Sequence, residues 1–405
     1  MLTKLSVKNF RLLRDVSIDI EPGKPIVLIG PNGSGKSSVL QVLDLLGRWA
    51  TDGFQKGLEA FGGMGALLTA AEAEVTIAVE LQDLPTLRPV LPTRYGMTAR
   101  ANIKSEWLEE ERHRVGYVNL LLRDFKNIIV HNERDNLDTG MTIGQDLPAH
   151  STESELSLQL FKGSVNYPTL NRVRTELAGI EVYSGFLSAP RWAREMREGS
   201  LSPFDSAIVA PVPRIDRRGF DLVNALFHLQ NNHHDVWEEL VSAFRAEFPF
   251  VQRFEFPADP AGGKIALGWR DQRFPGVRMQ GHQMSEGMTS YLCLLAALLC
   301  PEPAAAIAFD NPDAHLHPSA MRRLVYLLEK ASERTAVFVA THSDRFLDFL
   351  SDPGGSLRVC EPKDGGVTVQ SLNREALDEW RKDYSLAELR GRGHLDTANA
   401  STAEP

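Results

Sequence analysis

The chain has 405 residues, of which 43% are hydrophobic and 24% are charged, and its formal net charge is −9. Such a composition supports one large core or two ordinary ones and excludes a disordered chain. The longest apolar run, residues 292–300, is about half of what a bilayer span needs, and the N-terminus lacks a signal-peptide core. We therefore expect a cytoplasmic protein with no membrane partner. The acidic balance argues against strong non-specific binding of nucleic acid.

Cysteines and arginines add two further expectations. The cysteines are too few and too irregularly spaced for a disulfide framework or a zinc site, so we expect them to be reduced and structural: Cys293, Cys300 and Cys360. Two arginine clusters are local candidates for DNA binding, although solvated surface arginines are the plainer interpretation of each. The first is Arg191, Arg194 and Arg197, and the second is Arg214, Arg217 and Arg218.

The first 83 residues predict half of an α/β core. Apolar and polar residues alternate over 5–8 and 16–21, which predicts two strands joined as a hairpin. Ile26–Ile29 is a short continuous apolar run, typical of a strand buried on both faces. A glycine-rich turn follows, and then an amphipathic helix with its buried face at Val39, Val42, Leu43 and Leu46.

Residues 84–210 read as an inserted lobe. The chain is less regular from about residue 73 to residue 210: strand-like stretches at 75–81, 118–122 and 127–130 are separated by polar sequence, and we expect the segment 131–152 to be mobile. Sustained heptads are missing, which excludes a long coiled-coil arm.

Residues 211–395 predict the second half of the core. Helices are expected at 222–229, 236–244, 285–299 and 319–331, and buried strands at 304–309 and 335–340. Such alternation predicts parallel strands covered by helices. Residues 396–405 are small and polar, and we expect a flexible tail.

Residues 30–37 (GPNGSGKS) fit the pattern G-x-x-x-x-G-K-[ST] between a buried strand and an amphipathic helix. Glycines there let backbone N–H groups turn toward phosphates, and the helix dipole favours an anion. We therefore expect ATP, with Lys36 reaching the β- and γ-phosphates and Ser37 ligating Mg²⁺. A chance glycine-rich turn is the alternative. The expected nucleotide contacts of the loop are Asn32, Gly33, Ser34, Gly35, Lys36, Ser37 and Ser38.

Asp310 ends the apolar run at 304–309 and is the expected second Mg²⁺ ligand; an ordinary turn residue is the alternative. The next residue, Asn311, stands where a glutamate base is usual. An amide cannot accept a proton, but it can orient a water, so slow hydrolysis stays possible. Asp313 is either a substitute base or a capping and turn residue.

Two histidine signals follow. The spacing of Asp313, His315 and His317 is open to a metal site, but their position in the turn before Pro318 favours contacts across a dimer interface. His342 follows the second buried strand, where a histidine can hydrogen-bond a γ-phosphate and sense its loss.

Residues 285–288 (SEGM) open a helix, with Ser285 as a good N-cap. Gly287 costs helix stability but leaves room for another group to approach. A plain helix start is the alternative.

Together, Lys36, Ser285 with Gly287, Asp310 and His342 occur in the order Walker A, signature, Walker B and switch histidine, which resembles the ABC-type ATPases. The segments 8–11 (KNFR), 285–289 (SEGMT) and 310–318 (DNPDAHLHP) resemble the RecF- and SMC-like AAA ATPases, as does the ending 384–389 (YSLAEL) with Gly391 and Gly393. The resemblance implies an α/β P-loop NTPase of the ABC/SMC-head type, with a mixed sheet, flanking helices and an inserted lobe.

The resemblance also implies a homodimer that closes face to face on ATP. Ser285 and Gly287 would then contact the partner's γ-phosphate, and Arg11 would lie near the nucleotide. Asn311 departs from the family pattern, and a glutamine-bearing Q-loop cannot be placed.

Two functions compete. The first is an ATP-gated dimerising ATPase of DNA maintenance or phage defence, with a separate effector chain because few residues follow His342. The second is an ATP-locked scaffold that hydrolyses little and recruits a partner protein. DNA binding rests only on the family and the arginine clusters.

Overall fold

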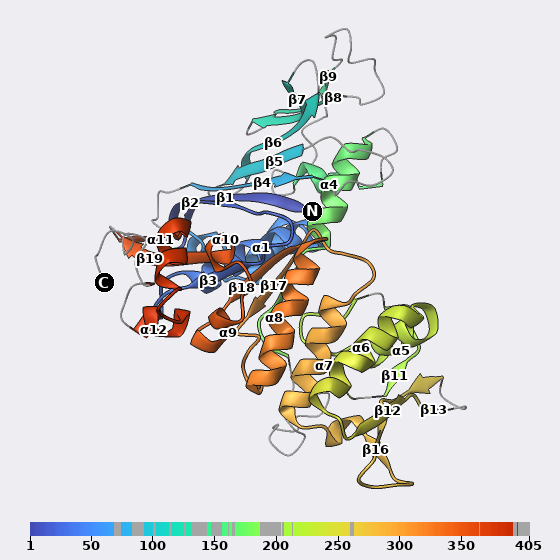
Figure 1. Cartoon of the computed structure of the whole chain (residues 1–405). Helices are drawn as coiled ribbons and strands as arrows, with labels where there is room; N and C mark the ends of the chain where they lie inside the picture. Colours follow the sequence, from blue (N-terminus) through green and yellow to red (C-terminus); the bar gives the residue numbers. More distant parts are fainter. Residues whose placement is uncertain are drawn as a thin grey trace.

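The computed structural model describes residues 1–68, 74–82, 93–99, 103–112, 116–124, 127–131, 144–146, 156–160, 162–163, 167–186, 204, 206–212, 214–259, 263–363, 365–391 and 395. Figure 1 shows a long sheet with helices packed against both of its faces. The flexible tail expected at 396–405, the arginine cluster at 191–197 and most of 131–152 lie outside the described residues.

One half of the sheet is parallel. Its strand order is β10 (Glu181–Tyr183), β17 (Ala306–Asp310), β18 (Ala336–Ala340), β3 (Ile26–Ile29) and β19 (Leu357–Lys363). All four pairs of neighbours run parallel. The carboxyl ends of β10, β17, β18 and β3 therefore meet at one edge, which is where α/β sheets bind ligands.

The other half is mainly antiparallel. It continues as β20 (Gly366–Ser371), β2 (Leu13–Asp19), β1 (Leu2–Phe10), β4 (Val75–Leu81), β5 (Thr93–Ala99), β6 (Ile103–Arg112), β7 (Gly116–Asp124), β8 (Asn127–His131) and β9 (Gly144–Asp146). β1 and β2 form the expected hairpin, with Leu5 paired to Ile18 and Val7 paired to Val16.

Alternate residues of the parallel strands enter two separate cores. In β3, Ile26 and Leu28 join the core under α1 (Lys36–Asp52), while Val27 and Ile29 join the core on the opposite face. Period-two alternation of this kind is what a strand covered on both faces requires. The continuous apolar run at Ile26–Ile29 is thereby explained.

The two faces are covered by different helices. The core under α1 also takes residues of α2 (Phe54–Glu59), the 3₁₀ turn that follows it (Met64–Ala66), α3 (Ser157–Leu160) and α4 (Pro168–Ala178). The opposite core takes α5 (Leu222–Asn232), α6 (His234–Glu247), α7 (Glu286–Leu298), α8 (Pro318–Ser332) and α9 (Asp344–Asp348). Figure 1 shows α7 and α8 below the parallel strands.

Smaller elements complete the fold. Two three-stranded sheets are formed by β11 (Ala207–Ile208), β14 (Lys264–Ile265) and β13 (Ala258–Asp259), and by β12 (Val251–Glu255), β15 (Gly268–Asp271) and β16 (Arg278–Gln280). A 3₁₀ turn at Gly281–Gln283 precedes α7. Three short helices follow α9 in the chain: α10 (Pro353–Ser356), α11 (Arg374–Trp380) and α12 (Leu386–Gly391).

The α/β class with a mixed sheet and flanking helices is confirmed. The 84–210 stretch, however, is not self-contained: β5 to β9 extend the antiparallel half of the main sheet, and β10 forms the opposite edge of the parallel half. β10 is a short three-residue strand that sequence periodicity cannot reveal. All three cysteines are free and buried. None of the helices in the described part of the chain is long and apolar enough to cross a membrane.

Candidate functional site

The loop 30–37 leaves the carboxyl end of β3 and leads into α1. Gly35 has φ 83°, a left-handed conformation that non-glycine residues rarely adopt. A Cβ on Gly30, whose φ is 143°, would collide with the Cys360 carbonyl oxygen of the neighbouring strand and lie 2.7 Å from the Ser34 hydroxyl. Glycine at these two positions is therefore required by the tight turn and by the close approach of β19.

The N-terminus of α1 has no side-chain cap. Gly35 is the N-cap residue, and the first turn contains no acidic side chain. The hydroxyl of Ser34 is fully buried and has no hydrogen-bond partner among the described residues. An uncapped 17-residue helix with a polar atom left unpaired beside its start suits an anion with several acceptor oxygens. Asn32 and Gly33 are exposed on the same loop, and Ser38 is half-buried in the first turn.

Lys36 is folded back into its own loop. Its Nζ donates hydrogen bonds to the Gly30 and Pro31 carbonyl oxygens, each at 2.9 Å, and the residue is only 6% exposed. Burial lowers the pKa of Lys36, and the positive charge of Arg390 acts in the same direction. The ammonium group therefore lies inside the curve of the loop, where its positive charge would stabilise a bound phosphate.

Ser37 and Asp310 meet at the carboxyl edge of the sheet. The Ser37 Oγ donates to Asp310 Oδ2 at 3.1 Å, and the Asn311 amide donates to the other carboxylate oxygen at 3.0 Å. The described residues contain no group of three or more His, Cys, Asp or Glu side chains that could hold a metal ion without other ligands. Mg²⁺ commonly takes one or two carboxylates together with water and phosphate oxygens, so this hydroxyl and carboxylate fit it.

Asn311 adopts a left-handed conformation with φ 51°. Its N–H donates to the Ala340 carbonyl oxygen at 2.8 Å, which ties it to the end of β18. Asparagine tolerates this conformation better than most residues do. Local backbone geometry thus favours an asparagine here over the usual glutamate.

Asp313 links the two loops that follow β17 and β18. Its Oδ1 accepts a hydrogen bond of 2.7 Å from the Thr341 hydroxyl, which in turn accepts the Ser343 N–H at 3.0 Å. The carboxylate is therefore engaged in holding the turn.

The metal-site alternative for Asp313, His315 and His317 has no support in the described structure. His317 is the N-cap of α8, and its Nδ1 accepts the Ser319 N–H at 3.4 Å. His315 Nε2 lies 3.7 Å from a Glu286 carboxylate oxygen. Each of the three side chains thus has a different neighbour, and they do not converge on one point.

His342 lies directly after β18, one strand away from Asp310. Its side chain is exposed, and its carbonyl oxygen accepts a hydrogen bond from Arg390. Partial desolvation, followed by the positive charges of Lys36 and Arg390, lowers the pKa of His342 below its usual value; Asp310 and Asp313 act in the opposite direction. The imidazole is therefore neutral near pH 7, in a form that can accept a hydrogen bond through one nitrogen and donate through the other.

Ser285 and Gly287 open α7. The Ser285 hydroxyl is exposed and accepts the Met288 N–H at 3.3 Å as an N-cap. A Cβ on Gly287 would lie 2.8 Å from the His315 carbonyl oxygen. The space beside this glycine is therefore filled by the His315 backbone of the same chain. The described contacts of both residues lie outside the 30–37 loop.

Arg11 reaches α1 from the turn between β1 and β2. Its guanidinium donates a hydrogen bond to Gln41, and it lies 6.0 Å from the ring centroid of Phe61. Gln41 stands one helical turn after Ser37, on the same face of α1. Arg11 is therefore placed beside the metal-side face of the loop and helix.

A cavity of about 260 Å³ adjoins Ser37 and Asp310. Gln41, Ser184 and Arg218 line it; Arg218 belongs to the second arginine cluster, whereas Gln41 and Ser184 were not singled out from the sequence. The helical spacing from Ser37 would have found Gln41. Ser184 follows the short strand β10, and Arg218 is far away in the chain, so only the fold brings them here.

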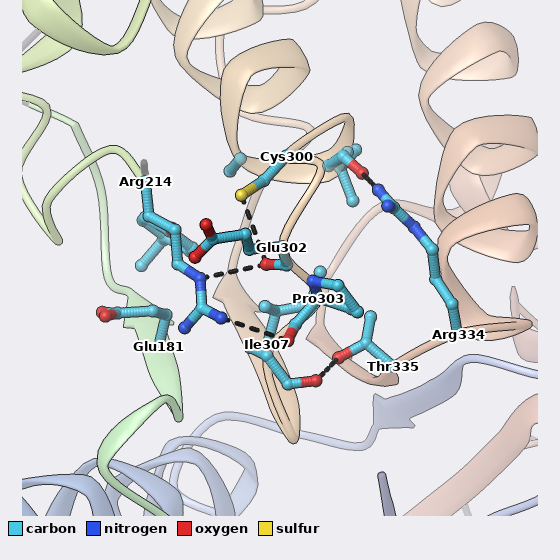
Figure 2. Close-up of a pocket in the computed structure, with 12 residues that line it drawn as sticks. Glu181, Arg214, Cys300, Glu302, Pro303, Ile307, Arg334 and Thr335 are labelled. Atoms are coloured by element: carbon cyan, nitrogen blue, oxygen red, sulfur yellow. Dashed lines mark hydrogen bonds between the residues drawn. The ribbon is translucent and has the colours of Figure 1, made fainter. Parts of the chain in front are cut away.

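The cluster Arg214, Arg217 and Arg218 is not one surface patch. Arg214 donates to the Glu302 and Pro303 carbonyl oxygens at 3.0 and 3.1 Å, as Figure 2 shows. Arg217 forms ion pairs with Asp44 and with Glu181. Two of the three arginines are thus engaged in contacts within the protein, while Arg218 is exposed.

The pocket drawn in Figure 2 is a separate feature. It holds only about 20 Å³ and is lined by Ala304 and Thr335, which lie at the amino ends of β17 and β18. Burial raises the pKa of Glu181 there to about 7. The pocket lies at the amino ends of the parallel strands, whereas Ser37 and Asp310 lie at the carboxyl ends. It is also too small for a nucleotide.

Comparisons with known proteins agree with this geometry. Residues 1–137 match a family described as "AAA ATPase domain", and residues 169–348 match one described as "AAA domain, putative AbiEii toxin, Type IV TA system". Among curated proteins, the hemin import ATP-binding protein HmuV of Agrobacterium fabrum is 64% identical over 33 residues, which is 8% of this chain and 13% of that protein. The zinc import ATP-binding protein ZnuC of Yersinia pestis is 46% identical over 44 residues, 10% of this chain and 17% of that one. The chain thus spans only a small part of the curated relatives it matches.

A solved SMC head bound to the C-winged helix domain of ScpA has a TM-score of 0.53 and 15% sequence identity, covering 93% of this chain and 99% of that one. At this identity the likeness concerns the fold, which is that of an SMC-head P-loop NTPase.

Proposed function

We propose that this chain, which matches AAA-family models over residues 1–137 and 169–348 and shares the fold of an SMC head, binds ATP with Mg²⁺ and hydrolyses it slowly as a face-to-face dimer. The observation that carries this proposal is the contact between Ser37 and Asp310 beside an uncapped helix N-terminus. This contact supports a Mg²⁺ donor pair beside a phosphate-binding loop.

Nucleotide binding is assigned to the 30–37 loop. The N-terminus of α1, which has no side-chain cap, and the buried Ser34 hydroxyl would supply donors for phosphate oxygens. Lys36 would exchange its two loop carbonyls for the β- and γ-phosphates. Ser37 and Asp310 would hold Mg²⁺, which neutralises phosphate charge when bound. Arg11 supports the adjoining face of α1 through Gln41.

Hydrolysis is assigned to Asn311, Asp313 and His342 as a slow process. Asn311 has an amide beside the Asp310 carboxylate and can orient a water without taking its proton. His342, neutral near pH 7, can hydrogen-bond the γ-phosphate side of the site. Asp313 carries a carboxylate whose Oδ1 accepts from Thr341, so Oδ2 would be the oxygen that takes a proton.

Dimerisation is assigned to the exposed start of α7. Ser285 is exposed, and its described contacts do not reach the loop of its own chain. A second copy that presents Ser285 and Gly287 to this loop would complete the site from the open side. The cavity beside Ser37 and Asp310 remains accessible in the single chain and supports a composite site.

An ATP-locked scaffold is the second candidate. Asn311 favours it, because the amide hydrogen-bonds the Asp310 carboxylate and no glutamate occupies this position. Such a head would close on ATP, stay closed, and recruit a partner chain. The SMC head that shares the fold is bound to a winged-helix domain of ScpA, which supports a separate partner protein here as well.

The biological setting that we propose is DNA maintenance or phage defence with a separate effector chain. Support comes from the RecF- and SMC-like head and from the toxin–antitoxin description of one matching family. Direct DNA binding has weaker support, since Arg214 and Arg217 are engaged within the protein.

The test compares wild type with Lys36→Ala and Asn311→Glu. Lys24→Ala, which removes a half-buried lysine paired with Glu21 and Asp352, is the matched control. Binding of a fluorescent ATP analogue, light scattering with ATP and Mg²⁺, and phosphate release are measured. We expect Lys36→Ala to lose binding and dimerisation while Lys24→Ala keeps both. If wild-type turnover is no higher than that of Lys36→Ala, the proposed ATPase function is ruled out and the scaffold function is left. If ATP and Mg²⁺ produce no dimer, both dimeric functions fail.

A further inference from the structure

The short helix α12 is fixed against α9. The backbone N–H groups of Leu386 and Ala387 donate to the Asp348 carboxylate at 2.8 and 3.3 Å. Leu386 and Leu389 are buried, and Ser385 with Glu388 closes the first turn through reciprocal hydrogen bonds. Although it belongs to the C-terminal segment of the chain, α12 is thus a docked part of the head.

Arg390 extends from α12 toward the end of β18. Its Nη1 donates to the His342 carbonyl oxygen at 3.3 Å and to the Asp344 carboxylate at 2.9 Å. The side chain is only 14% exposed. Asp344 is the first residue of α9, so one guanidinium fastens both ends of the segment that carries His342.

The charge of Arg390 also reaches the phosphate-binding loop. It acts on Lys36 and on His342 in the same direction, lowering the pKa of each. The groups that face His342 are Lys36, Arg390, Asp310 and Asp313. Arg390 therefore adds one positive charge to the side of the site where Lys36 lies.

We propose that Arg390 is a positioning residue for His342, through which the C-terminal helix α12 becomes part of the nucleotide site. The bond to the His342 carbonyl fixes the backbone from which the imidazole projects, and the bond to Asp344 prevents α9 from drawing this segment away. This inference rests on the proposed role of His342 in the nucleotide site. It assigns a role to the 384–391 segment, which the proposed function leaves unused.

The experiment compares Arg390→Ala and Arg390→Lys with a matched control, Arg374→Ala. Arg374 also forms a 2.8 Å ion pair, with Asp352, from the neighbouring C-terminal helix α11. We expect Arg390→Ala to lower kcat for ATP about tenfold with KM within about twofold, because a hydrogen bond to a charged group is worth about 1.5 kcal/mol or more. Arg390→Lys should recover part of kcat, and Arg374→Ala should behave as wild type.

A second readout does not depend on turnover. In full-length protein with labelled histidines, the imidazole signal of His342 is assigned by its loss in His342→Asn. Arg390→Ala should shift this signal and raise the pKa of His342, while Arg374→Ala should do neither. Unchanged kcat together with an unshifted His342 signal overturns the proposal. If wild type proves not to hydrolyse ATP, the proposed function fails, and the His342 signal still decides the role of Arg390.

Discussion

The Ser37 hydroxyl donates a 3.1 Å hydrogen bond to Asp310, a residue 273 positions later in the chain. The two residues lie on α1 and at the end of β17, and only the parallel pairing of β17, β18 and β3 brings them together. The proposed Mg²⁺ site depends on this contact.

Removing either partner should weaken nucleotide binding in the presence of Mg²⁺. We expect Ser37→Ala and Asp310→Asn each to lower the affinity for a fluorescent ATP analogue by roughly tenfold or more, since one charge-assisted contact is worth about 1.5–3 kcal/mol. The loss should shrink when Mg²⁺ is replaced by EDTA, because both residues act through the metal. Ser17→Ala, an exposed hydroxyl on β2, is the control. Equal losses with and without Mg²⁺ would contradict the metal role.

Replacing Asn311 with glutamate should speed ATP turnover and lower the stability of the fold. We expect Asn311→Glu to raise the rate of phosphate release by at least about tenfold, because a positioned general base typically contributes 10²–10⁴-fold. The same change should cost about 1 kcal/mol of unfolding free energy, since glutamate is strained at φ 51°. Asn311→Asp, which tolerates this conformation, should cost less. Urea titration measures the free energy; a glutamate variant as slow as wild type would show that proton transfer does not limit the reaction.

Replacing Gly287 with a larger residue should destabilise the protein. A Cβ there would lie 2.8 Å from the His315 carbonyl oxygen, and overpacking of this kind costs about 1–3 kcal/mol. Alanine's higher helix propensity returns up to about 1 kcal/mol, so we expect a small net loss in Gly287→Ala. Gly65→Ala, where a Cβ would meet nothing within 4 Å, should not be destabilised. If both variants unfold at the same urea concentration, the close approach of His315 is relieved without cost.

Glu181 should make stability fall as pH rises. Burial raises its folded pKa to about 7, above the ordinary value of 4.5. Between these values the folded protein holds a proton that the unfolded chain has released, so the unfolding free energy decreases with increasing pH. We expect wild type to lose on the order of 1–3 kcal/mol relative to Glu181→Gln between pH 5 and pH 8.

The check for Glu181 is urea unfolding of both proteins across this pH range. Asp221, whose pKa is also raised by burial to about 6, is present in both proteins, and its charge is one of those that raise the pKa of Glu181. Glu176→Gln is the control, since both side chains are 21% exposed. A difference between wild type and Glu181→Gln that stays constant from pH 5 to pH 8 would refute the prediction.

Local sequence patterns were enough to predict the individual elements of the site. The pattern at 30–37 identified the phosphate loop, and period-two or continuous apolar runs identified Ile26–Ile29 and the strand that ends at Asp310. These signals are local, because turn geometry, helix starts and strand burial depend on neighbouring residues. The hairpin of β1 and β2 was predictable for the same reason.

Contacts between residues far apart in the chain could not be predicted in this way and follow from the folded arrangement. It moved Arg214 and Arg217 from an expected surface cluster into internal contacts, made β10 the edge of the parallel half of the sheet, and set the His315 carbonyl against Gly287. It also placed Arg390 beside His342 across 48 residues. Such contacts are fixed by sheet order and helix packing, which periodicity along one strand or helix does not encode.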